Sequence, residues 1–323
     1  MITLKSQRGF SLVEAMVAMV ISLVLIAGIV QIYLSNKETY RFGEAVSRVQ
    51  ESGRFALDFL TTEIRMADFW GCTAFGGMSS DLNPAGAGYI DFLNAGNGGL
   101  TGTEGGANPD SITIAGAYDR GITVQEPYMP TVSASLFISQ GHGLEDDDII
   151  MVSDCEQGDI FQVTNVQDGT GGNSGKNSLV HNTGTSLNLT GDLSKTYEGD
   201  ASVYQMMQRT FFIADNPVGE RALFMSENGA AAEELVDGIE DMQITYGEDT
   251  DGDGVPNRFV NANNVGDMES VLAVRITLVV RSIEDGVMDD PQVYVVDGAS
   301  VTAADRRLRQ VFTSTISIRN RLN

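Results

Sequence analysis

Apolar residues fill positions 15–30 almost without interruption, and an amphipathic pattern follows up to about residue 68. In the second part, apolar residues recur at steps of three or four, which is typical of a helix with one buried face. This stripe consists of Phe42, Val46, Val49, Ala56, Leu60 and Ile64, with Gly53 filling one gap. No proline interrupts residues 10–68, so we predict one continuous helix. At 1.5 Å per residue its length is roughly 85–90 Å.

The rest of the chain has shorter patterns that are typical of β-strands. From residue 110 onward, β-branched runs alternate with Gly, Asn and Asp, which favour turns. The predicted strands are residues 111–114, 136–139, 149–152, 160–166, 186–189, 203–214, 222–225, 241–246, 271–281 and 310–318. A long helix followed by many strands predicts an α+β fold, with the helix packed on an antiparallel sheet.

The residues before the apolar run are unusual for a membrane segment. Lys5 and Arg8 precede Gly9 and Phe10, and Glu14 lies inside the first turn of the apolar helix. An acid within a membrane span costs about 2.5–3.5 kcal/mol even on lenient insertion scales, so it needs a partner. Cleavage between Gly9 and Phe10 would create a charged amino terminus that supplies one.

This arrangement resembles the signal of type IV pilins. The resemblance implies a leader of residues 1–9 that prepilin peptidase removes after Gly9, with N-methylation of the new terminus at Phe10. It implies that Glu14 is the assembly acid, which pairs with the terminal amine of a neighbouring subunit. Residues 10–35 are then the transmembrane and filament-core helix, and residues 36–69 are the amphipathic half of the same helix.

Two other interpretations explain less of this segment. A secretory signal peptide has an apolar region of about 7–15 residues and a small-residue cleavage site, whereas this run is longer and no clean Ala-x-Ala site follows Val30. A plain signal anchor explains the span and its basic flank but not Glu14 or the Gly-Phe junction. In every case Lys5 and Arg8 predict a cytoplasmic N-terminus, with the head across the inner membrane.

The charge of the chain narrows its possible partners. The formal net charge is −24, with 44 acidic and 20 basic residues. Phosphates would be repelled, so we expect no nucleic-acid partner, and the head is not expected to lie on an anionic lipid surface. Solubility is the ordinary reason for such a charge, and attraction of divalent cations is the more specific one.

The chain has two cysteines, Cys72 and Cys155. A head outside the cytoplasm is in an oxidising compartment, which favours a disulfide between them. On the chain-entropy model, closing a loop of roughly 80 residues contributes about 4 kcal/mol. The alternative is a pair of unpaired buried thiols. With two histidines in the chain, a zinc site is a poor explanation.

The resemblance extends to minor pilins of the PilW kind over several further segments. Residues 55–60 and 63–72 resemble the end of their helix and the following cysteine. Residues 234–247 resemble the entry to their sheet, and residues 306–322 resemble their C-terminal strand. The similarity weakens over residues 76–195. It therefore implies a β-rich head of residues 70–323, with a variable insert at 76–195 and a core sheet at 196–323.

An acidic loop at residues 249–257 is the second candidate site. Asp249, Asp251 and Asp253 occupy alternate positions, as carboxylates do at positions one, three and five of a calcium-binding loop. Val255 would offer a backbone carbonyl, and Asn257 a side-chain oxygen. Calcium is the predicted ligand, because closely spaced carboxylates repel one another unless a cation neutralises them.

The loop departs from the EF-hand pattern. Val260 stands where a bidentate Glu belongs, and strands rather than helices are predicted on both sides. Asp267 or Glu269 are candidates to complete the shell. The alternative is a solvated hairpin tip, because Asp-Gly is also a common turn dipeptide.

No enzyme is predicted. His142 lies in a Gly-His-Gly loop and His181 follows a short apolar run. The sequence has no nucleophile elbow, no His-Glu-x-x-His pair and no phosphate-binding glycine loop.

Together these features predict a minor pilin of a type IV pilus. The expected role is initiation of pilus assembly, with the subunit at the pilus tip. Cell adhesion and twitching motility are the expected activities of the pilus. The expected partners are prepilin peptidase, and other minor pilins and the major pilin through the helix. The location is the inner membrane before assembly and the cell surface afterwards. The alternatives are a minor pseudopilin of a type II secretion system, a calcium-dependent tip adhesin, and a membrane-anchored hydrolase.

Overall fold

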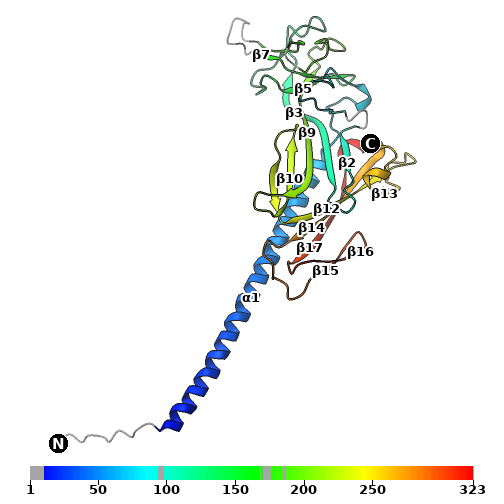
Figure 1. Ribbon diagram of the computed structural model, residues 1–323. Coiled ribbons are helices and arrows are strands. Elements are labelled where there is room, and N and C mark those ends of the chain that lie inside the picture. The colour runs from blue at the N-terminus through cyan, green and yellow to red at the C-terminus, as the bar shows by residue number, and fades with distance from the viewer. Residues whose placement is uncertain (1–10, 94–97, 168, 170–175, 185–186, 323) are drawn as a thin grey trace, which may run out of the picture.

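The molecule consists of one long helix and a β-rich head that packs on part of it. The computed structural model describes residues 11–93, 98–167, 169, 176–184 and 187–322. Helix α1 (Leu12–Arg65) is a rod with a β-rich head at its upper end, and its lower half extends free of the head (Figure 1). The α+β fold class with a long N-terminal helix is thus confirmed.

Helix α1 is continuous through its glycines and ends slightly earlier than predicted. Gly43 and Gly53 both lie within the helix without a break. The helix ends at Arg65, not near residue 68. Asp68 has a φ of 62°, in the left-handed region, which terminates a helix because an L-residue there cannot continue it.

The predicted apolar stripe is the docking face of α1. Val49, Ala56, Leu60 and Ile64 are buried, together with Gly53 in the gap. Phe42, near the lower edge of the head, remains 44% exposed. The stripe therefore contacts the head only from about residue 45 upward.

A small antiparallel sheet lies against this stripe. Its strand order is β13-β12-β14-β17, and β17 makes the most extensive contact with α1. Its strands are β12 (Ile239–Glu248), β13 (Arg258–Val260), β14 (Val271–Arg281) and β17 (Arg309–Ser317). Strand β14 is central and almost wholly buried, as its run of Val, Ile and Leu predicts.

A larger sheet rises from this core to the far end of the head (Figure 1). Strand β9 is its central strand: β3 pairs along one edge, and the other edge pairs with β5 at residues 202–205 and with β10 at residues 209–215. Its strands are β1 (Met78–Ser80), β2 (Leu100–Thr103), β3 (Ser111–Thr123), β5 (Ile149–Ser153), β6 (Gly158–Gln162), β9 (Ser202–Asp215), β10 (Arg221–Glu227) and β11 (Glu233–Asp237). The β1–β6 pair is parallel and the other described pairs are antiparallel.

Two minor sheets complete the described strands. One has the order β4-β8-β7 and lies at the far end, and the other is the hairpin β15–β16 beside β17 (Figure 1). Their strands are β4 (Leu136–Ile138), β7 (Asn165–Gln167), β8 (Asn177–Val180), β15 (Val293–Val296) and β16 (Ala299–Thr302). Short 3-10 turns lie at Phe75–Gly77 (η1), Ala262–Asn264 (η3), Met268–Ser270 (η4) and Arg319–Arg321 (η5).

The predicted strands agree best with the observed strands where the apolar run in the sequence is longest. The prediction for residues 271–281 matches β14, and those for 203–214 and 310–318 match β9 and β17 to within a residue or two. The prediction of a strand at residues 186–189 is wrong for its described part, where Asn188 forms only an isolated bridge with Leu82. Residues 185–186 lie outside the described part.

Candidate functional site: helix α1 and the loop after β12

The first turn of α1 is built around Ser11 and Glu14. The Glu14 amide donates to Ser11 Oγ, and the Ser11 amide donates to Glu14 Oε2, both at 3.3 Å. This reciprocal pair is a capping box, and it places an acid where the helix dipole favours negative charge. Glu14 thus faces outward at the start of the apolar segment. Gly9 and Phe10, the predicted cleavage residues, lie outside the described residues.

The lower half of α1 has no cover from its own chain. Its large apolar side chains are between 47% and 76% exposed from Leu12 to Leu34. By length and composition, α1 is the one helix among the described residues that is apolar enough to cross a membrane. An exposed apolar surface of this extent marks a membrane or protein contact, because a soluble monomer rarely leaves one open.

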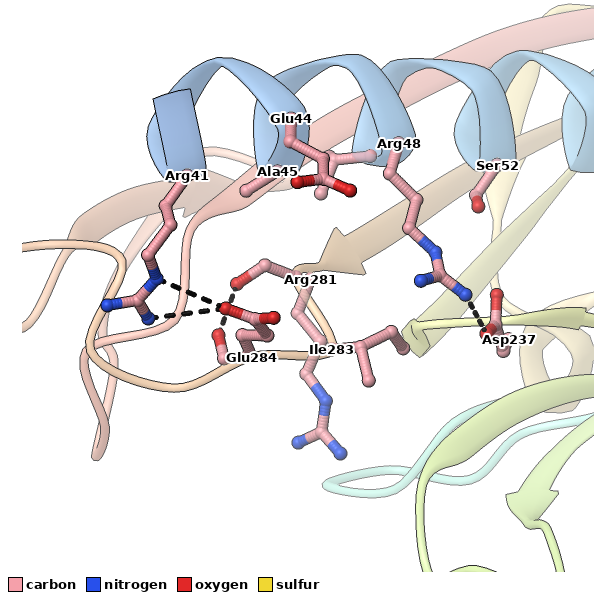
Figure 2. A pocket seen from close by; sticks show the side chains of 11 residues that line it. Arg41, Glu44, Ala45, Arg48, Ser52, Asp237, Arg281, Ile283 and Glu284 are labelled. Carbon is pink, nitrogen blue, oxygen red and sulfur yellow. Dashed lines mark hydrogen bonds and ion pairs between the residues drawn. The ribbon is translucent and has the colours of Figure 1, made fainter. Parts of the chain in front are cut away.

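The upper half of α1 is held to the head by packing and by peripheral ion pairs. The ring of Phe312 lies directly over Gly53, where a side chain would overlap it. At the lower edge of the head, Arg48 pairs with Asp237 at 2.9 Å and Arg41 with Glu284 at 3.2 Å (Figure 2). Pairs this exposed contribute about 0–1 kcal/mol, so the buried stripe provides most of the attachment.

A partly buried network of arginines and carboxylates joins the two main sheets. Its members are Glu220, Glu240, Arg281, Asp305, Arg307 and Arg309. Arg309 has a side chain only 3% exposed, with Nε 2.5 Å from Glu240 and Nη2 3.1 Å from Asp305. Hydrogen bonds from Arg307 lower the pKa of Glu220, and those from Arg309 lower the pKa of Asp305. The sequence signal for this network is the arginine-rich run at residues 306–309.

A second cluster fixes the end of α1 and the C-terminal segment. Asp68 accepts hydrogen bonds from Trp70 Nε1 and the Gly99 amide at 2.7 Å each, and from Arg321 Nε at 2.6 Å. Arg321 is 5% exposed at its side chain, so it is a buried positive charge paired with one carboxylate. Asp68 therefore joins the end of α1, the segment before β2 and the η5 turn at one point.

Cys72 and Cys155 form a disulfide, as predicted. It links the segment after α1 to the turn between β5 and β6, across 83 residues of sequence. The cross-link therefore ties the larger sheet to the segment that follows the helix.

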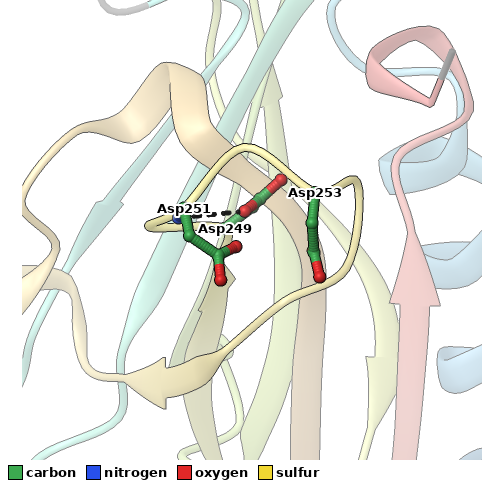
Figure 3. Close-up of side chains that lie close together, drawn as sticks. All are labelled: Asp249, Asp251 and Asp253. Carbon is green, nitrogen blue, oxygen red and sulfur yellow. Dashed lines mark hydrogen bonds between the residues drawn. The ribbon is translucent and has the colours of Figure 1, made fainter.

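The acidic loop brings its three aspartates together. Carboxylate oxygens of Asp249, Asp251 and Asp253 all lie within 4.8 Å of one another (Figure 3). Asp249 accepts the amides of Gly252 at 2.7 Å and Gly254 at 2.8 Å, and these bonds lower the pKa of its carboxyl. Both glycines have positive φ, which allows the loop to fold tightly around Asp249. Carboxylate oxygens this close together are a group that could hold a metal ion.

The other predicted ligands, Asn257, Val255 and Asp267, make hydrogen bonds within the loop or beside it. Asn257 Oδ1 accepts the amide of Thr250 at 2.6 Å, which closes the loop on itself. Val255 is 60% exposed and its amide donates to Asp253 Oδ1. Asp267, a candidate to complete the shell, caps η4 through the amide of Glu269 at 3.0 Å. Among the described residues, the convergent carboxylates are therefore the three aspartates.

The two histidines lie apart from both of these sites. His181 is buried between the carbonyl oxygens of Gly191 and Ala134, at 3.0 and 2.8 Å from its ring nitrogens. His142 is also buried, and its Nδ1 accepts the amide of Leu144 at 3.0 Å. Both side chains make structural contacts within the insert.

Comparisons with known proteins match the two ends of the molecule. The family model described as Type IV Pilus-assembly protein W matches residues 210–320, which run from β9 to η5. The model of the prokaryotic N-terminal methylation motif matches residues 4–30, which include Gly9, Phe10 and Glu14. No curated protein and no solved structure matched the chain. Pilin-family domains are structural rather than enzymatic. The two matches confirm the resemblance predicted from the sequence: over these residues the chain is similar to type IV pilus-related pilins of the PilW-like kind.

Proposed function

We propose that the chain is a minor pilin that initiates assembly of a type IV pilus and occupies its tip. The observation that carries this proposal is the uncovered apolar half of α1 with Glu14 in its first turn, since both need partners outside the chain. The methylation motif supports processing of a precursor by prepilin peptidase, with cleavage after Gly9 and methylation of Phe10.

The mechanism is transfer between two apolar environments. Before assembly, α1 is stored in the inner membrane, with Lys5 and Arg8 keeping the N-terminus cytoplasmic and the head periplasmic. During assembly, helix–helix contacts with neighbouring pilins replace lipid contacts. Glu14 then pairs with the terminal amine of a neighbour, which removes an otherwise unpaired charge from the apolar core.

The size of the head supports a position at the tip. Beyond the small sheet that packs on α1, the larger sheet and the insert extend to the far end of the molecule (Figure 1). A head of this bulk is difficult to repeat at each step along a shaft, whereas one copy at the end meets no such constraint.

The test is assembly in cells that lack the native gene copy. We expect Glu14→Ala to leave membrane insertion and head stability intact while removing most surface filaments. Glu38→Ala is the matched control, because it removes an acid from the same helix beyond the apolar run. Equal filament numbers for Glu14→Ala and the parent chain would contradict the pairing role of Glu14.

We also propose that the loop of residues 249–257 binds calcium through Asp249, Asp251 and Asp253. The support is the convergence of the three carboxylates within 4.8 Å. Calcium should raise the melting temperature of the full chain in detergent, and Asp251→Ala should abolish this rise. Asp289→Ala, in another acidic segment of the head, is the control. An absence of any calcium response in the parent chain would exclude this site.

A further inference from the structure

Strand β17 is an edge strand of the sheet that packs on α1. Its hydrogen bonds show which of its backbone groups face β14 and which face outward. The Ile318 amide donates to Leu272 O at 3.0 Å, and the Ser282 amide donates to Leu308 O at 2.8 Å. Both pairs have the register that joins β14 and β17. In an antiparallel pair, alternate residues exchange both hydrogen bonds with the partner strand. The even-numbered residues of β17 therefore face β14.

The backbone N–H and C=O groups of the odd-numbered residues of β17 then point away from β14. Arg309 confirms this, because its amide and carbonyl both bond to the side chain of Gln292, at 2.8 and 2.9 Å. Beyond Arg309, the outward backbone groups of residues 311, 313, 315 and 317 have no hydrogen-bond partner among the described residues. Thr313, Thr315 and Ser317 are also exposed. The upper part of β17 is thus an open edge.

Nothing in the sequence protects this edge. Exposed edges are usually blocked by lysines, prolines, bulges or inward-pointing charges. Residues 310–318 contain none of the charged residues and no proline, and the β14–β17 register has no bulge. The hairpin β15–β16 meets the face of the sheet, where Thr277 Oγ1 donates to Asp297 at 3.2 Å, and so leaves the edge beyond Gln292 open.

Strand β17 runs in the same direction as α1. Its middle residue Phe312 contacts Gly53, while Asn320, just beyond its end, donates to the carbonyl of Ala67 at 3.0 Å. A neighbour that is anchored by a parallel helix therefore meets this edge with its own strands already aligned along the same axis.

The direction of β17 argues against a second copy of this chain as the partner. Two β17 edges facing each other in chains with parallel helices must be related by a twofold axis along the strands. That symmetry puts the two α1 helices on opposite faces of the joined sheet, where they cannot pack together. The other edge of the same sheet is β13, which has three residues and follows the acidic loop. It is too short to pair along all of the open edge.

We propose that residues 311–317 of β17 accept an extended strand from a different pilin-type subunit, which continues the sheet across the subunit boundary. Each of the four outward residues offers one N–H and one C=O to the added strand. The inference rests on the proposed function, because it takes the partner from among the pilins that assemble beside α1. It adds the surface of the head that this partner contacts.

Amide hydrogen exchange at single-residue resolution tests the proposal. The full chain is compared in detergent and in isolated filaments. We expect exchange at Thr313, Thr315 and Ser317 to be fast in detergent and at least about tenfold slower in filaments, which corresponds to about 1.4 kcal/mol of protection. Phe312, Ser314 and Ile316 bond to β14 and should be slow in both states. This alternation distinguishes strand addition from general burial.

A proline variant tests the role of the outward N–H groups directly. Thr315→Pro removes one outward N–H but keeps the bonds to β14, as prolines on edge strands do. We expect it to lose the filament protection at Thr313 and Ser317 and to lower filament number, with the melting temperature of the full chain retained. Thr315→Val preserves the N–H and should behave as the parent.

The outcomes separate the two proposals. If the chain is present in filaments but the odd-numbered amides stay fast, the strand-addition proposal is wrong and the pilin role stands. If the chain is absent from filaments, both proposals fail. A photo-crosslinking residue in place of Thr315 identifies the occupant. A product that contains another pilin supports the proposal, and a product of two tagged copies of this chain contradicts it.

Discussion

The two halves of α1 form one continuous helix but differ in what covers their apolar side chains. The upper half buries a single stripe, with Ala56, Leu60 and Ile64 wholly shielded from solvent. The lower half is apolar on all sides and remains exposed, with Leu25 at 63%. The stripe finds its partner within the chain, in the sheet β12-β14-β17. The lower half has no such cover among the described residues, and in the proposed function lipid and other helices supply it.

This difference shows which substitutions report on the head and which on assembly. A side chain in the stripe contributes to the stability of the isolated chain. A side chain in the lower half contributes only when a membrane or a filament surrounds it. The same chemical change in the two halves should therefore give separable results.

The largest expected contrast uses one leucine from each half. Leu60→Ala removes a fully buried side chain and should destabilise the head by about 3 kcal/mol. Leu25→Ala changes an exposed side chain and should alter head stability by less than about 0.5 kcal/mol. Denaturant unfolding of the full chain in detergent, followed by the fluorescence of the buried Trp70, measures both. Similar losses in the two variants would contradict the division of the helix.

Removal of Arg309 should have a comparable effect without touching the helix. Arg309→Met leaves Glu240 and Asp305 without their buried partner, which costs about 3 kcal/mol for a group this enclosed. Arg275→Met is the control, since its guanidinium stacks on Phe259 at the exposed side of the sheet. Equal unfolding midpoints for Arg309→Met and the parent would show that the network contributes little.

Replacing two glycines of α1 by alanine should change the stability by smaller amounts and in opposite directions. A Cβ at Gly53 overlaps the ring of Phe312, so Gly53→Ala should destabilise the head by about 1 kcal/mol after the gain in helix propensity. Gly43 has open space around it, so Gly43→Ala should stabilise the helix by up to about 1 kcal/mol. Thermal unfolding of the two variants checks the signs. A stabilised Gly53→Ala variant would place the head away from this position.

The smallest expected effect is a pH dependence that belongs to the head alone. Glu220 and Asp305 have lowered pKa values, so their ion pairs stabilise the fold above the unfolded values near 4.5 and 3.8. This contribution is lost as the pH falls through the lower folded values. Burial raises the pKa of Asp241, which acts in the opposite direction.

Comparison with Glu220→Gln separates these opposing contributions. The variant should be less stable than the parent at pH 7, and the difference should narrow between pH 5 and pH 3, as about one linked carboxylate predicts. Urea unfolding over this range measures it. A constant difference at all pH values would exclude Glu220 from the acid transition.

The sequence predicted features that depend on local pattern. The continuous helix, its docking stripe and strand β14 follow from runs of apolar residues at fixed spacing. The acidic loop was found because Asp249, Asp251 and Asp253 are close in sequence as well as in space. The disulfide followed from the compartment and the presence of two cysteines.

Features that depend on register or on distant pairs were not predictable in this way. Arg309 and Glu240 are 69 residues apart, and Arg321 and Asp68 are 253 apart. The open edge of β17 depends on which residues face β14, which a pattern of period two does not specify without the strand partner. The short strand β13 carries no pattern long enough to identify it.

The most direct test of the account is the N-terminus of the native chain in isolated filaments. Mass analysis of the N-terminal peptide should show a chain that begins at Phe10 and carries one methyl group on its amine. Gly9→Val should leave the uncleaved precursor in the membrane fraction. A filament-bound chain that still begins at Met1 would contradict the account, because the Phe10 nitrogen would then be part of a peptide bond and not a free amine that pairs with Glu14 of a neighbour.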